Sequence, residues 1–294
     1  MEGRGVIPPP CVLIVATRGQ HRHHVNDTEP KKKKTKKKRT VTVDFCERRR
    51  MKFLMVFDFD HTVVDENSDL WVVRCLPSGR LPASIENSYR GGLWLEYMCR
   101  VMKYIGDQGI GADDIRSVME SIPFTDGMAD LLRFILENKS AVDCIVISDS
   151  NSLFINWALR AAALHAAVDE VFTNPAEFDD AGRVVVRPHH AHDCGKCPPN
   201  ICKRKVLERY LSERAEDGAR YERVFYVGDG GNDLCPAFCL RAQDAVMPRR
   251  DFTLLKLLAR LEAQPGAAPV KAGVLPWSSG AEILQELRAS MTSK

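Results

Sequence analysis

The sequence lacks any apolar run of about 18 residues, the length that a transmembrane helix needs, and therefore no membrane span is expected. Residues 11–16 form a short apolar segment, but three prolines precede it and a His- and Lys-rich stretch follows, which is not the pattern of an export signal. Ten cysteines without such a signal indicate free thiols in a reducing compartment rather than a disulfide framework. We therefore expect a cytoplasmic protein.

Charge is distributed unevenly along the 294 residues, whose net charge is +3. The first 50 residues carry 14 Lys and Arg against 5 Asp and Glu, whereas residues 51–294 carry 28 against 34. The block from Lys31 to Arg39 is broken only by Thr35. Such blocks are usually solvated and disordered, so we predict a disordered basic leader over residues 1–50. Contact with nucleic acid or with the nuclear import machinery, and hence a nuclear location, is the alternative.

From residue 51 onward, short β-rich runs alternate with segments of helical spacing. Strands are predicted over 53–57, 144–147, 171–173, 184–186, 224–227 and 245–247, and helices over 127–138, 152–164, 203–213, 252–261 and 281–289. This alternation predicts an α/β fold with a Rossmann-like, doubly wound parallel sheet. Residues 63–125 do not alternate and look mainly helical, as over 93–105. We therefore predict a core of residues 51–62 and 126–294 with an inserted helical cap of residues 63–125.

Two carboxylates, Asp58 and Asp60, follow directly on the first apolar run, in the string FLMVFDFDHT. Buried carboxylates are costly unless a cation or a hydrogen-bonding partner accompanies them. Because side chains alternate with a period of two in an extended strand, both carboxylates would face the same side and one ligand. This pattern predicts the catalytic centre of a phosphatase.

Three further polar signals stand at the ends of predicted elements. Ser148 and the string GDGGND, which holds Asp229 and Asp233, each follow a predicted strand, and Lys203 is the first residue of a predicted helix. Phosphoryl transfer accounts for all of them. Asp58 would attack phosphorus and form an aspartyl-phosphate, and Asp60 would act as proton donor and then as general base. Mg²⁺ would be held by Asp58, by Asp60 through its carbonyl, and by Asp229, with Asp233 holding Asp229 or a metal-bound water. Ser148 and Lys203 would stabilise the transferred phosphoryl group.

These motifs resemble the four motifs of haloacid dehalogenase-superfamily phosphatases. Longer strings, among them FDFDHTVVDENSDLW, ISDSNSLFI, CPPNICK and YVGDGGNDLCP, are similar to the PHOSPHO phosphatases of vertebrates. The resemblance covers about residues 51–291 and looks more like the kind that acts on pyridoxal 5′-phosphate than the kind that acts on phosphoethanolamine and phosphocholine. It implies a Mg²⁺-dependent Rossmann-like hydrolase with a helical cap, nucleophile Asp58, acid/base Asp60, and metal ligands Asp58, Asp60 and Asp229. His61 and the leader depart from the family pattern.

The same resemblance implies that Asp69 and Asp149 contact substrate. Two carboxylates facing a substrate would favour a cationic or hydrogen-bond-donating group, such as a choline, an ethanolamine or a pyridinium nitrogen. The expected partner is therefore a small phosphomonoester, with pyridoxal 5′-phosphate preferred and phosphoethanolamine or phosphocholine as the alternative. A more remote alternative is a non-catalytic interaction protein that acts through its basic tail.

The string HHAHDCGKCPPNIC, residues 189–202, is the strongest competing signal. A C-x-x-C pair with nearby histidines resembles part of a zinc site, but a second pair at the usual spacing is missing. We favour a loop of free thiols that positions Lys203, with structural Zn²⁺ as the alternative. Cys235 and Cys239, four residues apart on a predicted helix, are interpreted as small buried hydrophobic residues.

Overall fold

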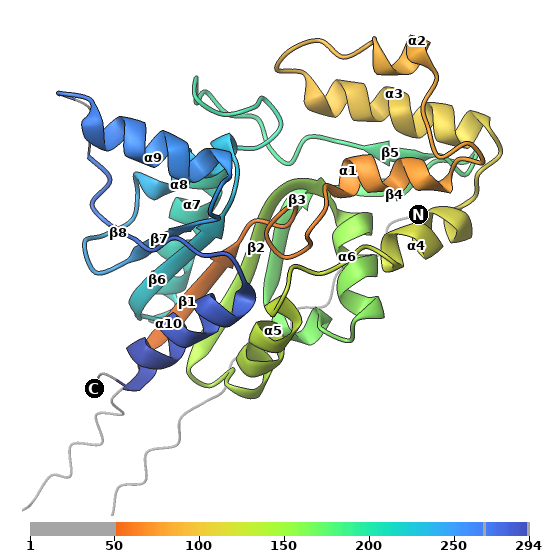
Figure 1. The fold of residues 1–294 in the computed structure, drawn as a ribbon. Coiled ribbons are helices and arrows are strands. Elements are labelled where there is room, and N and C mark those ends of the chain that lie inside the picture. The colour runs from red at the N-terminus through yellow and green to blue at the C-terminus, as the bar shows by residue number, and fades with distance from the viewer. Residues whose placement is uncertain (1–50, 267–268, 293–294) are drawn as a thin grey trace, which may run out of the picture. The chain divides into compact units, whose positions relative to one another are not determined.

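The computed structural model describes residues 51–266 and 269–292, and the predicted basic leader lies outside these ranges. Six strands form a parallel sheet in the order β3-β2-β1-β6-β7-β8 (Figure 1). Their bounds are β1 Lys52–Phe57, β2 Val142–Asn151, β3 Glu170–Asn174, β6 Tyr221–Gly228, β7 Ala245–Pro248 and β8 Gly273–Val274. The predicted α/β class is therefore confirmed. In the described part of the chain, no helix is long and apolar enough to cross a membrane.

Strand β1 lies in the middle of the sheet and is buried on both faces. Phe53, Met55 and Phe57 belong to one hydrophobic cluster, and Leu54 and Val56 belong to the other. This division follows from the period of two along a strand. A strand with apolar residues on both sides needs helices on both sides, which explains why the predicted sheet is doubly wound.

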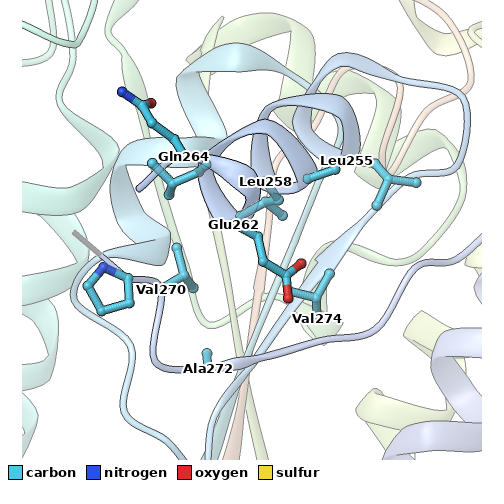
Figure 2. A pocket seen from close by; sticks show the side chains of 10 residues that line it. Leu255, Leu258, Glu262, Gln264, Val270, Ala272 and Val274 are labelled. Atoms are coloured by element: carbon cyan, nitrogen blue, oxygen red, sulfur yellow. The ribbon is translucent and has the colours of Figure 1, made fainter. Parts of the chain in front are cut away.

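Helices cover each face of the sheet with apolar stripes. On the Leu54 face lie α7, α8 and α9, with bounds Lys203–Glu216, Leu234–Ala237 and Thr253–Ala263. Beside α9, a cavity of about 540 Å³ opens toward residues 269–274 (Figure 2). Leu255, Leu258 and Val274 line it, and Glu262 is the one ionisable side chain among its lining residues. Because a phosphate site needs cations or several hydrogen-bond donors, this cavity is not the catalytic centre.

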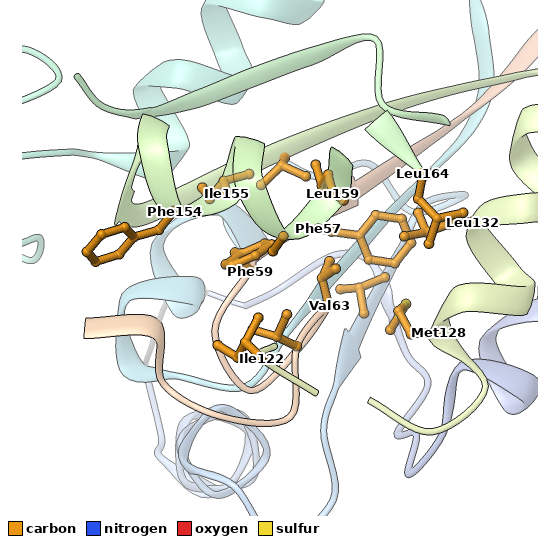
Figure 3. Packing of buried hydrophobic residues seen from close by; sticks show 14 of the residues in the cluster. Phe57, Phe59, Val63, Ile122, Met128, Leu132, Phe154, Ile155, Leu159 and Leu164 are labelled. Carbon is orange, nitrogen blue, oxygen red and sulfur yellow. The ribbon is translucent and has the colours of Figure 1, made fainter. Parts of the chain in front are cut away.

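On the opposite face lie α5, α6 and α10, with bounds Met128–Glu137, Ser152–Ala161 and Gly280–Thr292. Along α5, the buried residues Met128, Leu131, Leu132 and Ile135 recur at helical spacing, as predicted from the sequence. Figure 3 shows the packing beneath the end of β1, where Phe57 and Phe59 meet side chains of α5 and α6. Phe59 is fully buried, so the residue between the two carboxylates anchors their loop in the core.

The predicted cap segment is helical and contains no strand of the main sheet. It holds α1 Ser68–Trp71, the 3₁₀ helix η1 Val72–Cys75, α2 Ala83–Glu86, α3 Trp94–Asp107 and α4 Ala112–Glu120. A small antiparallel sheet, β4 Ala176–Phe178 with β5 Val184–Val186, lies beside α3. The sequence indicated β5 but not its pairing partner or its place outside the main sheet. The boundaries of the cap stay a prediction.

Candidate active site

A cavity of about 290 Å³ lies at the carboxyl ends of the central strands, where parallel α/β sheets bind their ligands. Five of the predicted site residues line it, four of them at or after the ends of strands: Asp58 and Asp60 after β1, Asp149 near the end of β2, and Asp229 after β6. Asp69 on α1 lines it as well. The topology therefore brings together acidic residues that are up to 171 positions apart in the chain.

Asp58 is buried and paired with a cation. Its Oδ2 lies 2.8 Å from Nζ of Lys203, and its Oδ1 accepts a hydrogen bond from the backbone N–H of Phe59 at 2.6 Å. The backbone N–H of Asp58 donates to the carbonyl of Val227, which continues the β1–β6 pairing by one residue. Burial raises the pKa of Asp58 and Asp233 raises it further, whereas Lys203 lowers it. One carboxylate oxygen thus faces a buried ammonium group.

Asp233 organises the turn that carries Asp229. Its Oδ1 accepts from Nζ of Lys203 at 2.8 Å and from the hydroxyl of Tyr226 at 2.7 Å, and its Oδ2 accepts from the N–H groups of Asp229 and Gly230. Four donors use the usual hydrogen-bonding capacity of one carboxylate. Gly228 makes room for this arrangement, since a Cβ there would lie 2.5 Å from Cγ of Asp233. Asp233 therefore acts by positioning its neighbours.

Asp60 belongs to a second set of contacts on the cap side of the cavity. Its Oδ1 accepts from the N–H of Ser68 at 2.9 Å. Burial raises its pKa well above the ordinary range, and the nearby Asp69 raises it further, while the Ser68 N–H lowers it. A raised pKa favours the protonated form of this carboxyl group. Asp60 is thus suited to give up a proton.

Trp94, the first residue of the cap helix α3, also lines the cavity. Its Nε1 donates to Oδ2 of Asp69 at 2.7 Å, and its ring lies 5.6 Å from that of Tyr89 and 5.4 Å from that of Tyr97. Burial raises the pKa of Asp69 to about 7, although the Trp94 hydrogen bond lowers it. No local signal in the sequence separates Trp94 from the other cap aromatics, because only the fold of α1 against α3 brings it to Asp69.

Ser148 and Lys203 are buried next to the cavity rather than among its lining residues. The Ser148 hydroxyl accepts from the N–H of Ser150 at 3.3 Å, so its own hydrogen is available to another acceptor. Strand β2 extends through Asn151, four residues beyond the run predicted from the sequence. Asp149 consequently lies within the strand and not in a loop after it.

His61 lines the cavity in a left-handed backbone conformation, with φ at 53°. Histidine is one of the few non-glycine residues enriched there. Its Nδ1 lies 3.1 Å from the carbonyl oxygen of Asp65, and its own carbonyl accepts from Arg249 at 2.6 Å. Arg249 also pairs with Asp65 and so joins the loop after β1 to the residue that follows β7. Arg249 lies outside the motifs that the sequence displays.

The acidic cluster fits a divalent cation. One carboxylate oxygen from each of Asp58, Asp229 and Asp233 lies within 4.8 Å of the others. With Lys203 as the adjoining cation, the ionised group would carry a charge of −2. Burial and the proximity of Asp233 raise the pKa of Asp229 to about 7, although Lys203 lowers it. Because four donors already use the oxygens of Asp233, Asp58 and Asp229 are the carboxylates of this cluster with capacity for a metal, and hard carboxylate oxygens are suitable ligands for Mg²⁺.

Comparisons with known proteins agree with this geometry. The model of the family described as "Putative Phosphatase" matches residues 53–291. The chain is 48% identical over 238 residues to the mouse pyridoxal phosphate phosphatase PHOSPHO2, covering 81% of this chain and 98% of that protein. It is 43% identical over 243 residues to the human phosphoethanolamine/phosphocholine phosphatase, covering 82% of this chain and 90% of that one.

The fold also matches a solved structure titled as a phospho-aspartyl intermediate analogue of phosphoserine phosphatase. The TM-score is 0.52 at 19% identity, and the match covers 80% of this chain and 99% of that one. At this identity the likeness concerns the fold alone. Taken with the sequence relatives, it confirms the haloacid dehalogenase-type architecture. The chain is therefore a phosphatase and belongs to the "Putative Phosphatase" family, in its PHOSPHO group.

Proposed function

We propose that this protein hydrolyses pyridoxal 5′-phosphate in a Mg²⁺-dependent reaction that passes through an aspartyl-phosphate on Asp58. The observation that carries the proposal is the buried Asp58–Lys203–Asp233 arrangement beside Asp229, at a cavity that Asp60 also lines. This arrangement supports the proposal because it would supply a nucleophile, a cation, metal ligands and a proton donor at one end of the sheet.

In the first half-reaction, a carboxylate oxygen of Asp58 attacks phosphorus. The N–H of Phe59 and the ammonium of Lys203 hold that carboxylate in one orientation, which lowers the entropic cost of the attack. Asp60 gives its proton to the leaving oxygen. The Ser68 N–H occupies Oδ1 of Asp60, so Oδ2 is the oxygen available to carry that proton.

In the second half-reaction, Asp60 is ionised and takes a proton from the water that attacks the aspartyl-phosphate. Lys203 remains next to the developing negative charge, because Asp58 and Asp233 hold its ammonium from two sides at 2.8 Å. The hydroxyl of Ser148, whose hydrogen is available, would donate to a phosphate oxygen. The phosphate product leaves once the bond to Asp58 is broken.

Asp58, Asp60 through its carbonyl, and Asp229 are the proposed ligands of the metal, and Asp233 positions Asp229. When bound, Mg²⁺ would neutralise charge on the substrate phosphate and on these carboxylates. Because the four hydrogen bonds to Asp233 use its oxygens, we assign it no direct metal bond.

The proposed substrate rests on the cap side of the cavity and on the relatives. The Trp94 ring offers an aromatic surface for a pyridine ring, and Asp69 and Asp149 offer acceptors for a pyridinium N–H. The first relative named above carries a pyridoxal phosphate activity in its name. The same acidic and aromatic groups could hold an ammonium group, so phosphoethanolamine and phosphocholine are the second candidates.

The test is a comparison of kcat/KM for pyridoxal 5′-phosphate, phosphoethanolamine and phosphocholine, with the full chain and Mg²⁺. We expect the pyridoxal ester to have the highest value. Asp58→Asn should lower turnover by about 10³-fold or more, whereas Asp130→Asn, which changes an exposed carboxylate on α5, should leave it unchanged. Equal activity of Asp58→Asn and wild type would overturn the mechanism, and a preference for an amino-alcohol ester would overturn the substrate assignment.

A further inference from the structure

Four cysteine sulfurs converge at one point on the side of the sheet that carries α7 and α8. They belong to Cys194 and Cys197 in the loop before α7, to Cys202 at the N-cap of α7, and to Cys235 in α8. All four sulfurs lie within 4.8 Å of one another. We propose that they form a structural zinc site with four thiolate ligands.

The sulfur–sulfur distances fit a tetrahedral metal centre. Cys194 lies 3.7 Å from Cys197 and 3.8 Å from Cys235, and Cys197 lies 3.6 Å from Cys202. Four ligands at a Zn–S distance of about 2.3 Å in a tetrahedron are about 3.8 Å apart. A disulfide would require a distance of about 2.05 Å. The sulfurs therefore have the separation expected around one mononuclear ion, and not that of oxidised pairs.

The nearby histidines do not complete this ligand set, because both ring nitrogens of His192 and Nε2 of His190 contact backbone groups of the loop. Nε2 of His192 lies 2.8 Å from the carbonyl of Pro198, and its Nδ1 accepts from the N–H of Cys194. Nε2 of His190 accepts from the N–H of Cys202. These histidines hold the backbone of the loop, which leaves the four thiolates as the ligands. Soft thiolates in this number and geometry select zinc among the common divalent ions.

The surroundings can compensate the charge of such a site. Zinc with four thiolates carries a charge of −2, and Cys202 caps the N-terminus of the 14-residue helix α7, where backbone N–H groups favour negative charge. Arg204 follows in the first turn of that helix, and Lys196 lies between Cys194 and Cys197 in the chain. Positive groups are thus provided by the same segments that provide the sulfurs.

The four-cysteine site would stabilise the catalytic arrangement without taking part in the reaction. Cys202 directly precedes Lys203, and Cys235 follows Asp233 by two residues, so the ion would join both sides of the Lys203–Asp233 pair. None of the four cysteines lines the catalytic cavity. With four protein ligands the ion has no open position for substrate or water, which is the mark of a structural site.

The experiment measures zinc in the full chain, expressed with zinc and purified under reducing conditions in the absence of chelator. We expect about one tightly held zinc per chain by elemental analysis, and four sulfur neighbours at about 2.3 Å by X-ray absorption at the zinc edge. Cys235→Ser should lower the zinc content about tenfold or more under the same dialysis. Cys239→Ser, which changes a cysteine outside the cluster, should retain it.

The absorption measurement keeps the proposal falsifiable if Cys235→Ser fails to fold, because it uses the wild-type protein. Folded wild type that remains without zinc after expression with the metal would overturn the proposal. Nitrogen or oxygen atoms as the main zinc ligands would also overturn it, as would two disulfides among these cysteines in reduced preparations. Because zinc content and ligand type are read without an activity assay, this result is independent of the substrate assignment.

Discussion

Asp69→Asn is expected to make the magnesium-free protein more stable at alkaline pH. Asp69 is buried at the cavity, where burial and, to a smaller extent, the nearby Asp149 raise its pKa from 3.8 to about 7. The carboxyl group is thus easier to ionise in the unfolded chain than in the folded protein. The asparagine of the variant is neutral at every pH, and its amide oxygen can still accept the hydrogen bond from Nε1 of Trp94.

The sign and size follow from proton linkage. Because the pKa of Asp69 is raised in the folded protein, this residue lowers the stability of wild type as pH rises from about 4 to about 7, and its contribution changes no further above that. A shift of about three units corresponds to about 4 kcal/mol. This is an upper value, because the neighbouring Asp60 and Asp149 share the repulsion. Asp69→Asn should therefore exceed wild type by up to this amount near pH 8, and the difference should vanish toward pH 4.

The assay is urea unfolding followed by circular dichroism, with wild type and variant at a series of pH values in magnesium-free buffer. Asp113→Asn on α4 removes an exposed carboxylate and serves as the control, for which we expect a small difference without a marked pH trend. A stability difference for Asp69→Asn that does not grow with pH, or a variant less stable than wild type at about pH 8, would refute the reasoning.

Three further substitutions test the packing and the site. Gly280→Ala should destabilise the protein by about 1 to 3 kcal/mol, because the added Cβ would lie 2.5 Å from backbone atoms of Gly127 and Met128. Gly273→Ala is the control, since open space surrounds that position. Equal unfolding midpoints for the two variants would contradict the expected clash at Gly280. Lys203→Met should lower the free energy of unfolding by about 3 to 5 kcal/mol, because it leaves Asp58 and Asp233 without their cation. A loss below about 1 kcal/mol in urea unfolding would argue against this ion pairing. Trp94→Leu should lower kcat/KM for pyridoxal 5′-phosphate about five- to tenfold and that for phosphoethanolamine less; steady-state kinetics showing equal losses would exclude ring stacking.

Local patterns in the sequence determined much of this protein. The apolar run before Asp58 predicted β1, the spacing of Met128, Leu131, Leu132 and Ile135 predicted α5, and the confirmed parallel sheet follows from the alternation of such segments. The convergence of Asp58 and Asp229 on one cavity also followed, since parallel strands end at the same edge of a sheet. These features depend on periods of two and 3.6 residues, which a linear sequence displays directly.

Only the tertiary structure decided which distant side chains meet. Cys235 was interpreted as a buried hydrophobic residue, yet its sulfur lies 3.8 Å from that of Cys194, 41 positions away. Trp94 reaches Asp69 because α3 packs near α1, and Asp233 accepts hydrogen bonds both from Lys203 on α7 and from residues 226–230. Such contacts depend on how helices and loops pack, which the periodicity of the sequence does not predict. The sequence thus determined the strands and the acidic motifs, whereas the packing of the chain determined the partners of each side chain.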